Sequence, residues 1–204
     1  FGDMVDGVRY TFNHPGIFAL LSLTAASHLL LRPYIDLLPA FADTIFGLGE
    51  GGFAALAGAS GLGSLVGGTW LAIRGRTEGL TRLLTFGMLG SAMAMFVFAT
   101  TNIYPLALAC MTFLGFSLVT MAVTSQSLVQ NAVDTTKRAR VISFSTGMAV
   151  GFPALGALIL GSLGDVLGVQ APVLGAAALC MTYWLWASRR LRWQSDLMEA
   201  DPNK

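Results

Sequence analysis

The sequence predicts an all-α membrane protein, built as a bundle of six transmembrane helices. Of its 204 residues, 54% are hydrophobic and only 11% are charged, whereas an ordinary soluble domain carries roughly 25% charged residues. The few charges are clustered, which leaves uncharged runs at 51–73, 83–133, 141–164 and 166–188. These runs are continuously apolar and rich in Gly and Ala, without the alternation of transmembrane β-strands, so helices are the structure they favour.

The boundaries of the six spans follow from the length that a bilayer requires. A helix of about 20 apolar residues, rising about 1.5 Å per residue, crosses the hydrocarbon core. The run 83–133 is long enough for two crossings, and Asn102 and Pro105 mark the break between them. We therefore expect a bundle over 16–188 with spans at about 16–40, 51–73, 81–101, 104–132, 141–163 and 168–188.

The first fifteen residues have a different pattern. Apolar side chains recur there at helical spacing and predict an amphipathic helix lying at the membrane interface, 1–15, stopped by Pro15; they are Phe1, Met4, Val5, Val8 and Phe12. The stretch has no cleavable signal pattern and does not begin with Met. We expect it to be a linker inside a longer protein.

The basic residues predict the orientation. If there are six spans, every Lys and Arg except Arg32 falls on one side of the membrane, including those of the tail at 189–204. The connections on the other side carry Asp43, Glu50 and Asp165 and no base. The positive-inside rule makes the basic side, with both termini, cytoplasmic. The sequence shows no nucleic-acid signature.

Small residues and cysteines inside the spans predict helix packing. Gly63 and Gly67 form one GxxxG motif, and small side chains continue it. Close backbone approach is a main source of helix association in lipid, although two smooth faces could also slide during a transport cycle. Cys110 and Cys180 lack disulfide or metal spacing, so we expect both to pack in the core and expect no metal site.

A polar stripe runs along the predicted fourth span at helical spacing: Thr120, Thr124, Ser127 and Asn131, with Gln126 and Gln130 beside it. One interpretation is hydrogen bonding between helices, worth about 0.6 kcal/mol each. The other is a cavity lining. Our hypothesis is that Thr124 and Gln126 line a substrate path, with Thr120 as a further candidate.

Arg32 is the one Lys or Arg that does not fall on the predicted cytoplasmic side. About sixteen residues from Gly16 place it roughly 24 Å along the helix, in the outer third of a core about 30 Å thick. It could snorkel outward as an anchor. It could also pair with Asp36, four residues on, where Pro33 bends the helix, and so form an outer gate or a substrate-side charge pair. Both interpretations remain open.

Three stretches resemble a known family. "HPGIFALL…RPYIDLLPAFADTIFG" at 14–47, "AGASGLGSLVGGTWLAIRGR" at 57–76 and "RARVISFSTGMAVGFPALGALILGSLGDVLG" at 138–168 are similar to the seventh, eighth and eleventh helices of major facilitator superfamily transporters. The nearest branch includes the enterobactin exporter and macrolide-efflux-like proteins. Because nearly the whole chain is covered in order, it resembles the C-terminal half of such a transporter.

Two family motifs are altered. The loop motif Gly-x4-Asp-Arg-x-Gly-Arg keeps its basic part but has Ile73 at the acidic position, which puts an acid-base latch in doubt; its remnant is Gly68, Arg74, Gly75 and Arg76. The Gly-Pro-rich antiporter motif is matched in part by Gly147, Gly151, Pro153 and Gly156, which we interpret as a helix bend and a packing face.

The resemblance implies a secondary transporter and not an enzyme. It implies a proton-coupled exporter of small hydrophobic or siderophore-like molecules in the bacterial cytoplasmic (inner) membrane, needing no cofactor. The cavity would be shared with the missing N-terminal six-helix half, and this half offers His28, Asp36 and Glu50 as protonatable groups. An intramembrane enzyme is disfavoured because HExxH, GxSxG and acidic clusters are absent from the sequence. A stand-alone membrane subunit, or a half-transporter working as a dimer, remains the alternative.

Overall fold

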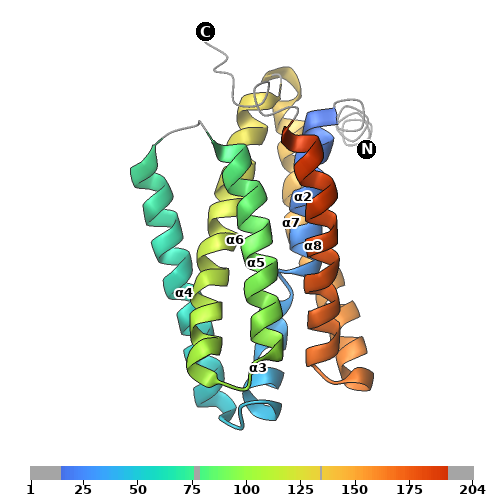
Figure 1. Cartoon of the computed structure of the whole chain (residues 1–204). Coiled ribbons are helices and arrows are strands. Elements are labelled where there is room, and N and C mark those ends of the chain that lie inside the picture. The colour runs from blue at the N-terminus through green and yellow to red at the C-terminus, as the bar shows by residue number, and fades with distance from the viewer. Residues whose placement is uncertain (1–14, 76–78, 134, 193–204) are drawn as a thin grey trace.

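The computed structural model describes residues 15–75, 79–133 and 135–192, and these residues form helices and no strand. The helices stand side by side as an elongated bundle (Figure 1). Their bounds are α2 Pro15–Leu30, α3 Tyr34–Thr44, α4 Gly49–Arg74, α5 Leu80–Thr100, α6 Tyr104–Ala132, α7 Thr135–Leu167 and α8 Gln170–Arg192. Six helical segments in the described residues are long and apolar enough to cross a membrane, with α2 and α3 together making the first. This confirms the predicted six-helix class and indicates a multi-pass membrane protein.

Two spans differ from their expected lengths. The first runs from Gly16 to Thr44, beyond the expected end near residue 40, because the chain resumes helical geometry after Pro33 and keeps it through Pro39. The fifth helix begins at Thr135, since the basic segment before the apolar run is itself helical. The predicted interfacial helix at 1–15 lies almost wholly outside the described residues, and so does the tail from residue 193.

Left-handed glycines close two of the connections. Gly75 caps α4 with φ +56°, and its N–H lies 3.4 Å from the carbonyl oxygen of Leu71. Gly168 has φ +80° between α7 and α8. A residue with a Cβ is strained in this region, so glycine lets each helix stop abruptly and the chain reverse.

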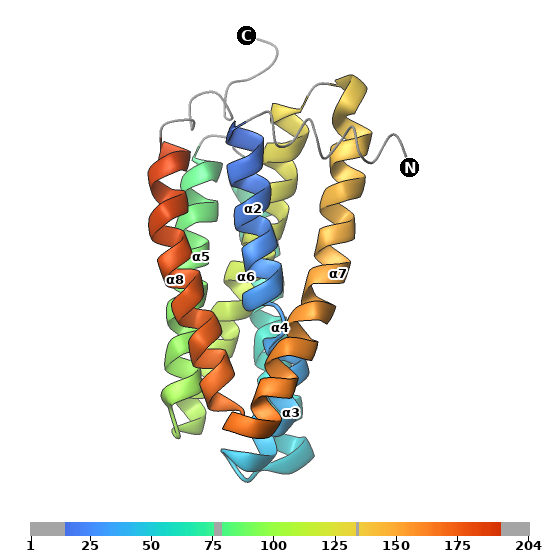
Figure 2. The ribbon, with the colours of Figure 1, turned by 90° about the vertical axis from the view of Figure 1, so that its right-hand side faces the viewer.

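Most packing contacts of the first three spans recur in the last three, although α7 contacts α8 without a comparable contact between α4 and α5. In the first three spans, α4 and α5 both pack on α6, the first helix of the second unit. Their counterparts in the second unit, α7 and α8, both pack on α2, the first helix of the first unit. Likewise α3 contacts α4 as α6 contacts α7, while α5 and α8 contact each other. Figure 2 shows α5 and α8 on one side of the bundle and α7 on the other, with α2 and α6 between them. Because each unit has three spans, the second unit crosses the membrane in the opposite sense, as in an inverted repeat.

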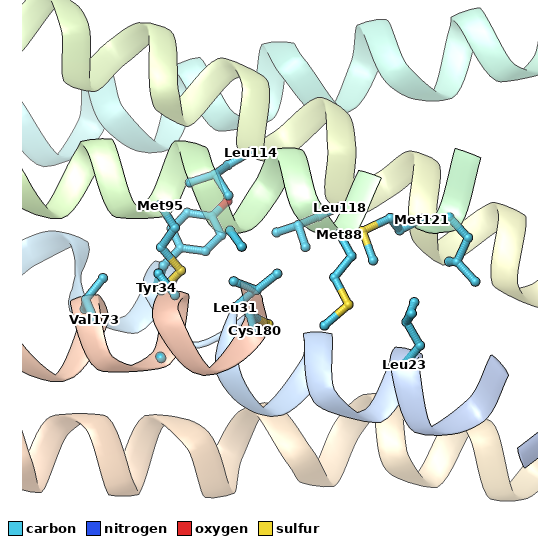
Figure 3. Close-up of a cluster of buried hydrophobic side chains, with 14 of the residues drawn as sticks. Leu23, Leu31, Tyr34, Met88, Met95, Leu114, Leu118, Met121, Val173 and Cys180 are labelled. Atoms are coloured by element: carbon cyan, nitrogen blue, oxygen red, sulfur yellow. The ribbon is translucent and has the colours of Figure 1, made fainter. Parts of the chain in front are cut away.

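The core lies between the first span, α5, α6 and α8. Figure 3 shows Leu23, Met88 and Met121 converging there, with Cys180 in the same cluster. Methionines adapt their shape to irregular gaps between helices. Cys110 and Cys180 are free and buried, which confirms their predicted role in packing.

Two helices are much less covered than the others. Within the most apolar window of each span, 22% of residues are buried in α4 and 11% in α7, against 39–50% in the other four. α4 and α7 are the second helices of the two three-span units. Both flank the pair formed by the first span and α6, so one open face of the bundle extends from α4 to α7.

Candidate functional site

The first span is interrupted at residues 31–33. The N–H groups of Leu31 and Arg32 both donate to the carbonyl oxygen of Ser27, at 2.9 and 3.0 Å. Pro33 has no N–H and stands at the start of α3. The sequence predicts a bend at Pro33, and the structure has a turn at 31–33 that separates two helices.

The turn changes the relation between Arg32 and Asp36. The prediction placed both residues on one helix face with a bend at Pro33, whereas Arg32 lies in the turn and Asp36 in the first turn of α3. Both side chains are exposed, and the described residues hold no ion pair between them. A gate that depends on this pair has no support from the geometry.

The depth of Arg32 also differs from expectation. The span continues to Thr44, so Arg32 lies near its middle and not in its outer third. It shares a cavity with Ser64 of α4 and Leu118 of α6, which lie near the middles of the spans Gly49–Arg74 and Tyr104–Asn131. Three helices therefore agree in placing Arg32 close to mid-depth.

Arg32 stands between two cavities. The larger, of about 280 Å3, lies between α3, α4 and α6, and its lining includes Tyr34, Ser60 and Ser64 besides Arg32. The smaller, of about 30 Å3, is lined by Thr24, Ser27 and His28 of α2 together with Arg32 and residues of α5 and α6. Four polar residues of the first span, Thr24, Ser27, His28 and Arg32, thus line cavities that α6 also borders.

Hydroxyl pairs hold these elements in place. The Tyr34 hydroxyl lies 2.5 Å from the Ser60 hydroxyl and ties α3 to α4. The Thr24 and Ser125 hydroxyls, 2.7 Å apart, tie α2 to α6. Tyr34, Thr24 and Ser125 were not predicted as functional residues. The spacing of Thr24, Ser27, His28 and Arg32 on one helical face was the signal that could have found the α2 group.

The two residues of α6 expected to line a substrate path, Thr124 and Gln126, do not share a face of the helix. Thr120 and Thr124 are buried, and Gln126 is exposed. Residues two apart point about 200° apart around a helix, so Thr124 and Gln126 cannot line a common path. The Thr120 hydroxyl donates to the Phe116 carbonyl oxygen of its own helix at 2.7 Å and lies beside Gly67, in the contact between α4 and α6.

Thr124 gives a direct test of this assignment. Its hydroxyl oxygen is fully buried without a hydrogen-bond partner. A buried unsatisfied polar group costs about 1–3 kcal/mol, so Thr124→Val, which keeps the shape, should raise the free energy of unfolding by about 1 kcal/mol. Unfolding in mixed detergent micelles would measure it, with Thr112→Val, an exposed threonine on the same helix, as control. A loss of stability in Thr124→Val would contradict a purely apolar environment.

The remnant of the loop motif ends a helix. Gly75 supplies the left-handed cap of α4, and the Arg74 guanidinium lies 5.6 Å from the centre of the Trp70 ring. Gly68 makes only an ordinary contact with Val119. Arg76 lies outside the described residues. The described part of the motif therefore has a structural role at the end of α4.

The two glycine motifs have opposite environments. A Cβ on Gly63 would overlap the Thr112 carbonyl, and one on Gly115 would overlap the Ser60 carbonyl, which confirms tight packing of α4 on α6. On α7, Gly156 packs with equal closeness against the Leu29 carbonyl and Pro33. Gly147 and Gly151, by contrast, have nothing within 4 Å of an added Cβ. Pro153 lies inside α7, which runs obliquely across the bundle (Figure 2).

The chain matches no protein-family model, no curated protein and no solved structure. The features that call for an explanation are the repeated packing pattern, the open face from α4 to α7, and a cationic cavity at mid-depth on that face.

Proposed function

We propose that this chain is one six-helix half of a secondary transporter of the major facilitator type. The observation that carries the proposal is the repetition of packing contacts between the first and last three spans. Each half of a major facilitator transporter is built from such a three-plus-three inverted repeat, with the substrate site near the bilayer midplane. The resemblance of the stretches 14–47, 57–76 and 138–168 to helices of major facilitator transporters supports the same proposal.

The open face supports the presence of a second half. α4 and α7 carry small residues where a lipid-facing helix has no need of them, and these residues are exposed: Gly51, Ala54, Ala55 and Gly58 on α4, and Ser143, Gly147, Gly151 and Ala154 on α7. Small residues let helix backbones approach closely in a membrane. A second six-helix bundle seated on α4 and α7 would enclose the cavity beside Arg32.

The proposed activity is proton-coupled export of small hydrophobic or siderophore-like molecules across a bacterial inner membrane. The basic ends of the spans, with Arg74, Arg82, Arg140 and Arg189, lie on one side, and Asp43 and its neighbours on the other. The positive-inside rule makes the basic side, and with it both termini, cytoplasmic. The larger cavity is mainly apolar with a few polar groups, which suits an amphipathic substrate.

Transport in proteoliposomes tests the proposal. The product of the complete reading frame should release dyes, macrolides or siderophores from vesicles when a pH gradient is imposed, and a protonophore should abolish the release. The 204-residue chain alone should insert and show no gradient-dependent movement, because its cavity is open on one face. Equal transport by the chain alone would contradict the half-transporter assignment.

A dimer of two such chains is the second candidate, since a second copy could cover the same open face. Cysteine crosslinking at Gly151 distinguishes the candidates. Crosslinks between two copies of the chain would support the dimer, whereas crosslinks confined to a preceding six-span segment would support the half-transporter.

A further inference from the structure

We propose that Arg32 is the binding site for the anionic group of the substrate, a carboxylate or similar oxyanion on an otherwise apolar molecule. The observation is a cation near mid-depth, at the wall of a cavity of about 280 Å3, without an acidic partner among the described residues. This inference deepens the proposed function and rests on it for the role of the cavity as a substrate path.

None of the acidic side chains among the described residues is an ion-pair partner of Arg32. Asp43, Glu50 and Asp165 lie at the far ends of their spans, well away from mid-depth. Asp36 is on α3 and forms no ion pair with Arg32. The other ionisable groups that line these cavities are His28, in the smaller one, and Tyr34, in the larger one. Neither of them supplies a compensating carboxylate.

An arginine at this depth is costly unless something compensates it. Placing an arginine at the centre of a helix in lipid costs on the order of 2.5–3.5 kcal/mol even in the most permissive measurements. From mid-depth its side chain is too short to reach either interface, so snorkelling does not remove the cost. Arg32 is exposed and borders two cavities. Its side chain is therefore accessible to a ligand that enters the cavity.

The surroundings of Arg32 favour a ligand with one anionic end and an apolar body. The planar guanidinium offers parallel N–H donors that fit a carboxylate in a bidentate manner. Ser60 and Ser64 lie on the same wall, but their hydroxyls already contact the Tyr34 hydroxyl and the Ser60 carbonyl oxygen. The rest of the lining is apolar or small, including Ile35, Leu38 and Val119. Charge recognition thus depends on Arg32, and the apolar wall holds the body.

A matched pair of fluorescent probes tests the inference. The full reading-frame product in nanodiscs is titrated with 11-(dansylamino)undecanoic acid and with its methyl ester, and saturable tryptophan-to-dansyl energy transfer is measured. The acid should bind about tenfold or more tightly than the ester, the ratio expected for hydrogen bonds to a charged group. Arg32→Gln should remove the difference between the two probes, and Arg32→Lys should keep part of it, because the charge remains without the bidentate geometry.

Arg82→Gln is the matched control, because Arg82 is an exposed base at the end of α5 and away from the cavity; it should bind both probes as the parent does. Equal affinity for acid and ester in the parent protein, or an undiminished preference in Arg32→Gln, would overturn the inference. The two proposals fail separately. Acid-selective binding without transport would refute the transporter alone, and transport indifferent to the anionic group would refute the anion site alone.

Discussion

Gly63→Ala and Gly115→Ala should each lower the free energy of unfolding by about 1–3 kcal/mol, the usual cost of overpacking, or by more. The added methyl of Gly63→Ala would overlap the Thr112 carbonyl, and that of Gly115→Ala the Ser60 carbonyl. Both obstacles are backbone atoms, which cannot rotate away as a side chain can. α4 and α6 would have to separate, and the neighbouring contact of Gly67 with Phe116 would loosen as well.

Gly58→Ala provides the control on the same helix. Gly58 is exposed and has nothing within 4 Å of an added Cβ. Alanine is about 1 kcal/mol better than glycine inside a helix, so this variant should be as stable as the parent or more so. Unfolding in mixed detergent and dodecyl sulfate micelles measures all three variants. If Gly63→Ala and Gly58→Ala were equally stable, the close crossing of α4 and α6 would be incorrect.

Gly147→Leu and Gly151→Leu should abolish transport by the complete protein while leaving the fold of this chain intact. Neither added side chain meets an atom of this chain at its Cβ, and surface substitutions of this kind usually change stability by no more than about 0.5 kcal/mol. In the proposed assembly the same positions pack against the second half. Overpacking there costs roughly 1–3 kcal/mol, which corresponds to an association of the two halves that is about fivefold to 150-fold weaker, and transport is lost with that association.

The control for this prediction is Gly175→Leu on α8. Gly175 is also exposed with nothing within 4 Å, but it belongs to the side of the bundle formed by α5 and α8, remote from α4 (Figure 1). Transport and unfolding are measured on each variant. Normal transport by the Gly147→Leu and Gly151→Leu variants would show that this face of α7 meets lipid, and the second half would have to sit elsewhere.

The number of spans and several of their ends could be read from the sequence because both depend on local composition. Charges such as Arg82 and Asp165 bound the apolar runs, and a bilayer accepts few charges within its core. The helix ends at Arg74 and Thr100 accordingly lie within a residue of expectation. The glycine motif at Gly63 and Gly67 was also recognisable, because small residues at i and i+4 leave a flat helix surface.

The sequence by itself therefore determined the all-helical class, the spans and the presence of Arg32 inside one of them. Only the tertiary structure decided which glycine surfaces are used, since Gly63 meets a backbone carbonyl while Gly147 meets nothing within this chain. It also decided that Arg32 lies near mid-depth and forms no ion pair with Asp36. A helix pattern fixes spacing along one segment, whereas depth, burial and partners depend on how segments distant in sequence pack. The turn at 31–33 breaks the regular spacing itself, and its place is set by Pro33 together with the packing of Gly156 against Leu29.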